Sequence, residues 1–345
     1  MIKTFNHTIF NAVELAHEEF EYFKSHGDIR SFTKAHGLDG IELQIIDPAD
    51  EDFLELDIIK GIHLSFFNCF MDFWLGDEER LAKEYGSLAV AHQFYGGTTK
   101  AAIIDKFTKE LERAERAGVQ YVVFHVSEVT IEECYTRQYT YSDAQVIDAA
   151  CEIINQLLVG KDYHFDFLME NLWWPGFNFL DPRMTKRLLD GIHYEHKGLM
   201  IDTGHLMNTN PDLRTQAEAV VYINTILDKH EELIPWIKGI HLNASLSGQY
   251  VQEEQVIPAT FDKDYKEKRQ ETFGHIFKLD QHRPFVDEGR HQIVKRIDPK
   301  YLTHELITNN REELVDYLHQ QKHNDGGVPT NDIKERICES YVLVK

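Results

Sequence analysis

A short stretch of the sequence places an acid and a histidine where an apolar segment ends. Residues 198–208 read Gly-Leu-Met-Ile-Asp-Thr-Gly-His-Leu-Met-Asn, which predicts a buried strand that leads into a turn carrying Asp202 and His205. A carboxylate and an imidazole bind Zn, Mn or Fe when both are deprotonated. The Asp-x-x-His spacing alone is weak, because it also arises by chance among structural residues. It gains weight only if other strands end in the same way.

Other predicted strands do end in metal-binding residue types. At or near the carboxyl ends of six segments stand His63, His125, Glu170, Asp202, His241 and Glu305. Packing alone would favour apolar groups at such places. Two further candidates, Asp280 and His282, are two residues apart, so in an extended segment both would point to one side and hold one ion together. The sequence therefore predicts a metal site assembled from several strands.

Strands and helices alternate along most of the chain. The predicted strands are an initial extended piece at 3–10 and the segments 40–46, 61–66, 119–125, 165–170, 199–202, 236–242 and 301–305. The predicted helices cover 28–36, 100–117, 142–158, 182–193, 213–233 and 312–320. About eight such units favour a (β/α)8 TIM barrel over a doubly wound sheet, and a barrel of this kind builds its active site at the carboxyl ends of its strands. The candidate ligands would meet there.

Two regions lie outside this alternation. Residues 243–298 are polar with mixed charge and too long for a simple connection, which predicts an elaborated loop over one end of the barrel after the seventh strand. Residues 324–345 begin with a Gly- and Pro-containing linker and form a short C-terminal extension. We therefore expect one catalytic barrel domain at 1–323, with 243–298 inserted in it.

Composition fits a globular enzyme. Hydrophobic residues make up 42% and charged residues 27% of the 345 residues, and no apolar run approaches the roughly 18 residues of a membrane span. The first residues contain no apolar stretch with a cleavage site typical of a secretory signal. The four cysteines are scattered and make no C-x-x-C pair, as expected for reduced thiols. These features predict a cytoplasmic protein.

The charge balance bears on possible partners. The formal net charge is -22, whereas proteins that bind nucleic acid gain most non-specific affinity from Lys and Arg neutralising phosphates. A local basic groove can exist on an acidic protein, so the net charge disfavours nucleic acid without excluding it. A small-molecule substrate, sugar- or phosphate-containing, is the expected partner.

The motifs around these residues resemble the xylose isomerase-like TIM-barrel superfamily, and the metal site resembles that of the endonuclease IV family (AP endonuclease family 2). The resemblance covers about residues 37–305. It is carried by Gly-Ile-His-Leu-Ser-Phe at His63, Val-Phe-His at His125, Met-Glu-Asn at Glu170, Ile-Asp-Thr-Gly-His at Asp202 and His205, Gly-Ile-His-Leu-Asn at His241, Asp280 with His282, and Glu305. The match at Asp280 and His282 competes with the nearby His275.

The resemblance implies a site for up to three zinc ions, with Mn or Fe as alternatives. Residue by residue, it puts His63, His125 and Glu170 on one ion, and it makes Glu170 a bridge to a second ion completed by Asp202, His241 and Glu305. His205, Asp280 and His282 would hold the third. Such ions suit phosphoester hydrolysis, because they acidify a water and stabilise the attacking and leaving oxygens. Glu170 and Glu305 are the implied catalytic residues.

Aromatic residues near these motifs are candidates for substrate contact. Phe66 follows the first histidine, and Trp173 and Trp174 directly follow Glu170-Asn171. They would form a wall against a sugar or base ring, or equally pack beneath the 243–298 segment. The acidic run at 47–52 departs from DNA-binding members of the family, which carry basic side chains in the early loops.

Three functions remain open on this reading. The favoured one is a multi-metal hydrolase acting on a phosphoester of a small sugar- or nucleotide-type substrate, with DNA disfavoured. The alternative is a sugar or sugar-phosphate isomerase or epimerase, which needs one metal and two glutamates from the subset Glu170, Asp202, His241 and Glu305. The third is a metal-binding barrel without activity, against which the complete ligand set argues.

Overall fold

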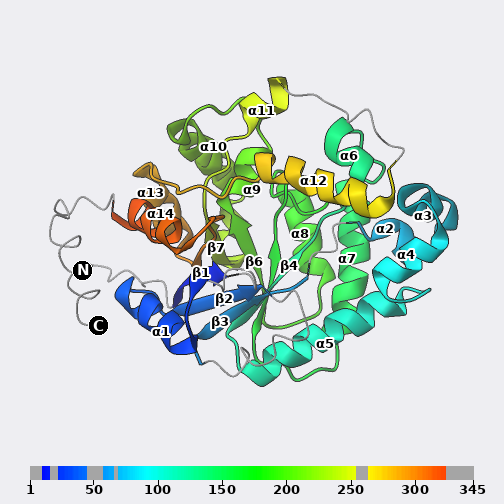
Figure 1. Ribbon diagram of the computed structural model, residues 1–345, viewed down its shortest axis with the longest axis horizontal. Helices are drawn as coiled ribbons and strands as arrows, with labels where there is room; N and C mark the ends of the chain where they lie inside the picture. Colours follow the sequence, from blue (N-terminus) through cyan, green and yellow to red (C-terminus); the bar gives the residue numbers. More distant parts are fainter. Residues whose placement is uncertain (1–9, 16–21, 45–56, 66–68, 254–262, 324–345) are drawn as a thin grey trace.

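Eight parallel strands form the centre of the molecule. The computed structural model describes residues 10–15, 22–44, 57–65, 69–253 and 263–323. Each strand pairs with the next in sequence order and the last pairs with the first, which closes a barrel (Figure 1). The strands are β1 (Phe10–Leu15), β2 (Gly40–Gln44), β3 (Ile59–His63), β4 (Tyr121–His125), β5 (Asp166–Glu170), β6 (Lys197–Asp202), β7 (Ile237–Leu242) and β8 (Tyr301–His304). The predicted (β/α)8 fold is confirmed.

Helices surround the barrel and cover its carboxyl end. They are α1 (His26–Ala35), α2 (Met71–Leu75), α3 (Glu78–Tyr85), α4 (Leu88–Tyr95), α5 (Ala101–Ala117), α6 (Ile131–Thr136), α7 (Asp143–Leu158), α8 (Pro182–Gly191), α9 (Thr203–Asn208), α10 (Gln216–Lys229), the 3-10 helix η3 (Glu231–Trp236), α11 (Gly248–Glu253), α12 (Tyr265–Leu279), α13 (Gly289–Ile297) and α14 (Arg311–His323). Within the described ranges, none of these helices has the length and apolarity that crossing a membrane requires.

The first strand differs from its prediction. It runs over Phe10–Leu15, whereas the predicted piece at 3–10 lies almost wholly outside the described residues. The predicted helix at 213–233 also divides in two. His230 ends α10, and a separate 3-10 helix that contains Pro235 follows. Proline has no backbone N–H, so an α-helix could not have continued unbroken through Pro235.

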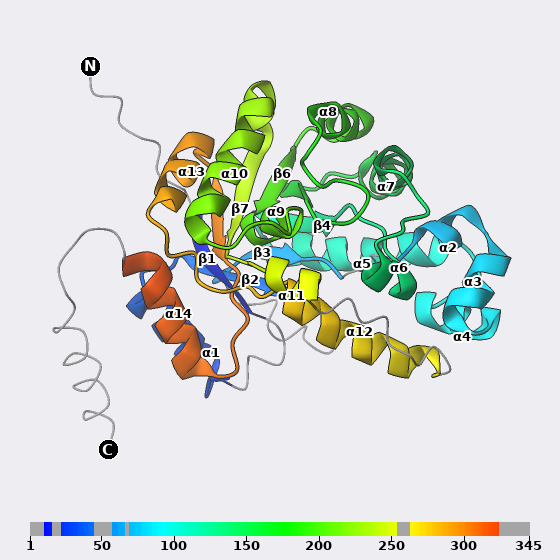
Figure 2. The same cartoon turned by 90° about the horizontal axis from the view of Figure 1, so that it is seen from above.

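The 243–298 segment is helical rather than a long loop. It contains α11, α12 and α13; residues 254–262 within it lie outside the described ranges. Helix α13 packs against α10 as an ordinary barrel helix. Figures 1 and 2 show α12 crossing the end of the barrel at which α9 and α6 begin. The predicted C-terminal extension at 324–345 lies outside the described residues.

The 71–95 region contains three short helices that the sequence pattern did not reveal. Asp77 and Ser87 are the N-caps of α3 and α4, and their side chains accept hydrogen bonds from first-turn amides. Each ends at a glycine with positive φ, which is the usual helix stop. Helices of eight residues or fewer show too few turns for a clear apolar period, so their caps were the better signal.

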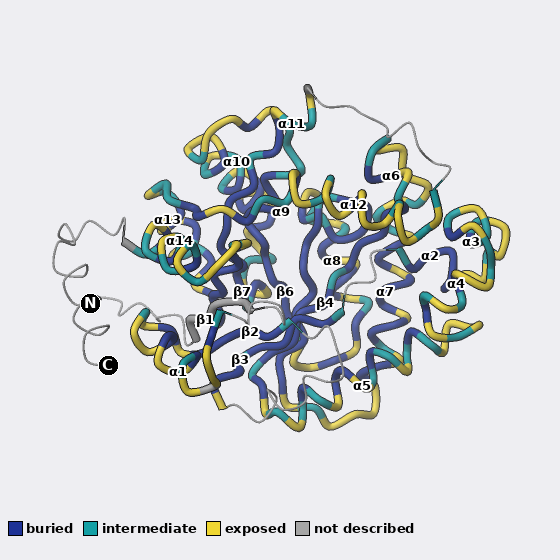
Figure 3. The backbone as a smooth tube through the Cα atoms, viewed as in Figure 1, coloured by how far each residue is buried: buried dark blue, intermediate teal, exposed yellow. Residues whose placement is uncertain are grey.

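Packing separates the barrel interior from the outer layer. Figure 3 shows buried residues along most of β2 to β8 and exposed residues on the outer faces of the helices. The interior is filled by the buried cluster of Tyr121, Val123, Leu168, Met200 and Tyr301. Layers of side chains of this kind make a TIM barrel a packed core rather than a pore. This packed cluster, called the barrel floor below, lies beneath the residues at the carboxyl end of the strands.

The first prediction concerns Gly61, which faces Tyr121 across β3 and β4. A Cβ atom at Gly61 would lie 2.2 Å from the Tyr121 ring, and the ring is fully buried. We expect Gly61→Ala to lower the free energy of unfolding by about 1–3 kcal/mol, because the overpacked core must shift. Urea titration checks this.

The matched control is Gly274→Ala in α12, where the added methyl group would meet no described heavy atom within 4 Å beyond its chain neighbours and the backbone of α12 itself. This variant is expected to gain about 0.5–1 kcal/mol from the better helix propensity of alanine. Equal unfolding midpoints for the two variants would contradict the account of the barrel floor.

Candidate metal centre

The structure brings all nine predicted ligand residues to the carboxyl end of the barrel. His63, His125, Glu170 and Asp202 are the last residues of β3, β4, β5 and β6. His241 is the penultimate residue of β7, and Glu305 directly follows β8. His205 lies in α9, while Asp280 and His282 lie between α12 and α13. Side chains from eight chain segments thus converge because parallel strands end at one rim.

Glu170 is at the centre of this group. Its Oε2 atom lies 3.0 Å from His63 Nε2 and 3.1 Å from His125 Nε2. Its Oε1 atom lies 3.0 Å from His241 Nδ1 and 3.4 Å from His205 Nδ1. Its side chain is fully buried. One carboxylate therefore contacts four imidazoles.

The second half of the centre is built around Asp280. Its Oδ2 atom lies 3.2 Å from His205 Nε2 and 2.9 Å from His282 Nε2. His282 has a φ of 44°, a backbone conformation uncommon outside glycine, and its amide donates to Ser245 Oγ at 3.2 Å. Strained conformations of this kind persist where the surroundings enforce them and cluster at functional sites. The competing residue His275 instead contacts Tyr250 and Cys134, away from the centre.

The donor atoms form four groups whose members lie within 4.8 Å of one another. The groups are Glu42, His63 and His241; His63, His125 and Glu170; Glu170, Asp202, His241 and Glu305; and Asp202, His205 and His282. Buried nitrogen and oxygen donors in such sets suit zinc and similar divalent ions. Glu170 links the second and third groups, and Asp202 links the third and fourth. The residues present therefore fit a multi-metal centre.

Two asparagines hold Asp202 in place. The Asn171 side chain accepts from the Asp202 amide at 2.9 Å and donates to the Asp202 carbonyl at 3.2 Å. The Asn243 side chain donates to Asp202 Oδ2 at 2.5 Å. Gly204 leaves room for the Asn243 side chain, since a Cβ there would lie 2.0 Å from Asn243 Oδ1. These three residues, which belong to the Glu-Asn, His-Leu-Asn and Asp-Thr-Gly-His motifs, thus all help to fix the position of Asp202.

Charges alternate within the cluster and shift its ionisation. Burial alone would disfavour charge, but the imidazoles of His241 and His125 lower the pKa of Glu170 well below its usual value. Burial likewise opposes protonation of His205, yet Asp202 and Asp280 raise its pKa to about 10. Neighbouring carboxylates also raise the pKa of His241 and His282, despite burial. For His125, burial prevails and lowers the pKa to about 4.

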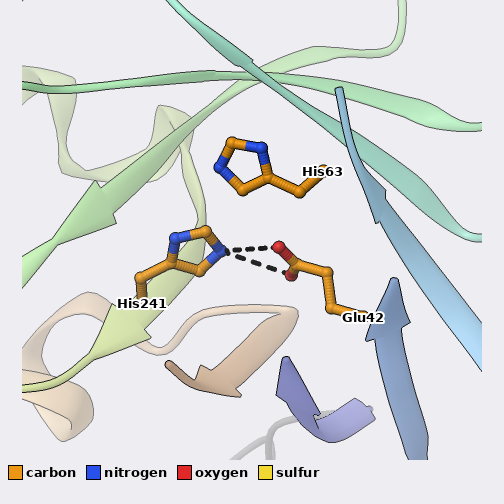
Figure 4. Close-up of side chains that lie close together, drawn as sticks. All are labelled: Glu42, His63 and His241. Carbon is orange, nitrogen blue, oxygen red and sulfur yellow. Dashed lines mark hydrogen bonds and ion pairs between the residues drawn. The ribbon is translucent and has the colours of Figure 1, made fainter. Parts of the chain in front are cut away.

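Sequence reasoning missed one member of the centre. Glu42 is a fully buried carboxylate on β2, and both its oxygens face His241 Nε2, at 3.1 Å and 3.2 Å (Figure 4). A signal existed, because Gly-Ile-Glu-Leu places an acid inside an otherwise apolar strand. The acid lies in mid-strand rather than at the strand end, where ligands were sought.

The three aromatic candidates have different positions. Phe66 lies outside the described residues. Trp174 is buried and packs with Val129, Cys134 and Leu172, as expected of a packing residue. Trp173 is partly exposed, with its ring centroid 5.2 Å from that of His205, and it packs against the same buried cluster as Trp174. A role in substrate contact stays a prediction for Trp173.

Comparison with known families agrees with this architecture. The model of the xylose isomerase-like TIM barrel family matches residues 31–306. The chain belongs to this family. The resemblance read from the sequence is thereby confirmed at the level of the superfamily. No curated protein sequence matches the chain.

Solved structures with the same fold cover most of this chain. A D-tagatose 3-epimerase-like protein is 13% identical over 95% of this chain and 99% of its own, with a TM-score of 0.52. The structure described as AsfvAP:AG is 12% identical over 90% and 96%, with a TM-score of 0.50. Endonuclease IV from Thermus thermophilus is 14% identical over 91% and 98%, with a TM-score of 0.48. At such identities the likeness to the first two structures shows the fold alone.

A second prediction follows from the ionisation of the centre. His205 is expected to be protonated in the metal-free protein at pH 7.5, because, against the effect of burial, Asp202 and Asp280 raise its pKa to about 10. A cation held by this imidazole must displace its proton, so zinc affinity should rise with pH. Titrating zinc into chelator-stripped protein in a pH-stat should therefore release at least about one proton per chain. Release of no protons would contradict the assigned ionisation.

Proposed function

We propose that this protein is a divalent-metal-dependent hydrolase that acts on a phosphoester of a small sugar- or nucleotide-type substrate. The observation that carries the proposal is the chain of adjoining donor groups joined by Glu170 and Asp202. Zinc is the best-fitting ion for these nitrogen and oxygen donors, with Mn or Fe as alternatives. A reaction that needs a single ion would leave His63, His125, His205, Asp280 and His282 without a role.

The residues would divide as follows. His63, His125 and Glu170 would hold one ion, Glu170, Asp202, His241 and Glu305 a second, and Asp202, His205 and His282 a third, with Asp280 beside the last two histidines. Adjacent divalent ions supply an acidified water and stabilise charge on the attacking and leaving oxygens of a phosphoester. Glu170 and Glu305 would orient the reacting groups.

Side-chain exposure indicates where substrate enters. Asp280, His125 and Glu305 are 13%, 10% and 8% exposed, whereas Glu170 and His241 are fully buried. Substrate would therefore approach over the first three, near Trp173. Access this restricted among the described residues favours a small phosphoester group over a wide duplex, in line with the net charge of -22.

The third prediction tests the number of ions. Protein purified without chelators should contain three divalent ions per chain by elemental analysis and should hydrolyse simple phosphomonoester or phosphodiester probes. His282→Ala should lose one ion and at least about 100-fold in rate, the order seen when one group that stabilises transition-state charge is removed.

His275→Ala is the matched control, because this histidine is close in sequence but contacts Tyr250 and Cys134 instead. It should retain all ions and the wild-type rate. If His282→Ala also retains both, the trinuclear proposal is wrong. Nicking of an abasic duplex at low salt tests the disfavoured DNA substrate separately.

A second candidate function rests on a specific group. Glu170, Asp202, His241 and Glu305 form a four-donor set with two glutamates, which suits proton transfer beside a carbonyl in a sugar isomerase or epimerase. Solvent deuterium incorporation into a ketose would support it. Under this alternative, His282→Ala would leave the reaction rate close to that of the wild type, which separates the two functions.

A further inference from the structure

Glu42 stands outside the nine ligand residues but contacts one of them. It lies on β2 and is fully buried, with its carboxylate directed at the edge of the His241 ring (Figure 4). The two nitrogens of that ring have different neighbours. Nδ1 lies 2.9 Å from Glu305 Oε2 and 3.0 Å from Glu170 Oε1, while Nε2 lies 3.1 Å and 3.2 Å from the two oxygens of Glu42.

The carboxylate of Glu42 is itself fixed. The hydroxyl groups of Tyr121 on β4 and Thr303 on β8 donate to Glu42 Oε2 at 2.6 Å and 2.8 Å. The Tyr121 ring packs against Tyr301, with centroids 4.3 Å apart, so the hydroxyl rests on the barrel floor. Three strands thus hold Glu42 below His241, at a fixed height in the barrel.

His63 has a neutral partner on one of its ring nitrogens. Its Nδ1 atom lies 3.1 Å from the carbonyl oxygen of Leu64. A carboxylate partner does more than a carbonyl, because it both fixes the ring tautomer and makes the opposite nitrogen a stronger electron donor. The carboxylate of Glu42 at Nε2 therefore distinguishes His241 from His63.

We propose that Glu42 is a positioning residue for the metal centre. With a cation in the centre, Glu42 would accept the Nε2–H of His241, while Nδ1, without a proton, would be directed at the group formed with Glu170, Asp202 and Glu305. The proposal rests on the metal centre proposed above, but not on the phosphoester reaction, since both candidate functions use this group. Glu42 itself does not touch the substrate or the reacting atoms.

Metal binding by matched variants tests this role. Glu42→Gln keeps the size of the side chain and an acceptor for Nε2–H but removes the charge. We expect it to bind the same number of zinc ions at saturation, with the affinity for one ion lowered about 10- to 100-fold. Competition with a chromophoric chelator measures this in the full chain.

Asp166→Asn is the matched control. Asp166 is another buried barrel carboxylate, paired with Lys238 and Lys300 at 2.7 Å and 2.9 Å, and it does not contact the centre. The Asp166→Asn variant should have a lower melting temperature than the wild type but the same zinc affinity. Unchanged zinc affinity in Glu42→Gln, or loss of a whole ion at saturation as for a direct ligand, would overturn the positioning role.

A measurement on the wild-type chain tests the proposal without a substitution that could disturb folding. Long-range 15N–1H spectra of the zinc-loaded protein should show His241 protonated at Nε2, and protonation at Nδ1 would overturn the proposal. If the wild-type chain binds no zinc at all, the proposed metal centre fails first. If it binds zinc but Glu42 has no effect, only this inference fails.

Discussion

The contact of one buried carboxylate with four imidazoles stabilises the cluster of charged residues at the carboxyl end of the barrel. Glu170 contacts His63, His125, His205 and His241 through its two oxygens. A buried carboxylate without partners would cost several kcal/mol of desolvation, so these contacts are a condition for the fold. The same alternation extends outward, with Glu42, Asp280 and Glu305 between the outer histidines. The set can thus be buried because opposite partial charges neighbour one another throughout.

The fold and most ligand positions follow from periodicity and residue type. Short apolar strands alternated with amphipathic helices, and polar residues at strand ends had to share one rim because parallel strands all end there. This reasoning found His63, Glu170 and Asp202 without knowledge of any contact. The asparagines at 171 and 243 were present in the quoted motifs, yet only the structure shows both bonding to Asp202.

The features that could not be predicted from the sequence were missed for physical reasons. Glu42 was missed because a mid-strand acid in an apolar run gives no directional signal until the opposing His241 is placed beside it. The helices at 71–95 are too short for a period to emerge. Helix α12 was read as a loop because it has few buried positions, Thr272 and Leu279 among them, and charged residues along much of its length. The reaction cannot be read from ligands that several chemistries share.

The closure of β8 on β1 ties the centre to the topology of the chain. The ligands extend in sequence from His63 to Glu305, and Glu305 directly follows the strand that completes the ring. No short segment holds the whole set, unlike a zinc finger, in which neighbouring residues capture the ion. Loop-closure entropy must therefore be overcome before the donors can meet. Any cation bound here would form its contacts late in folding rather than nucleate it, and it would oppose separation of β3 to β8, the strands that carry or adjoin its ligands.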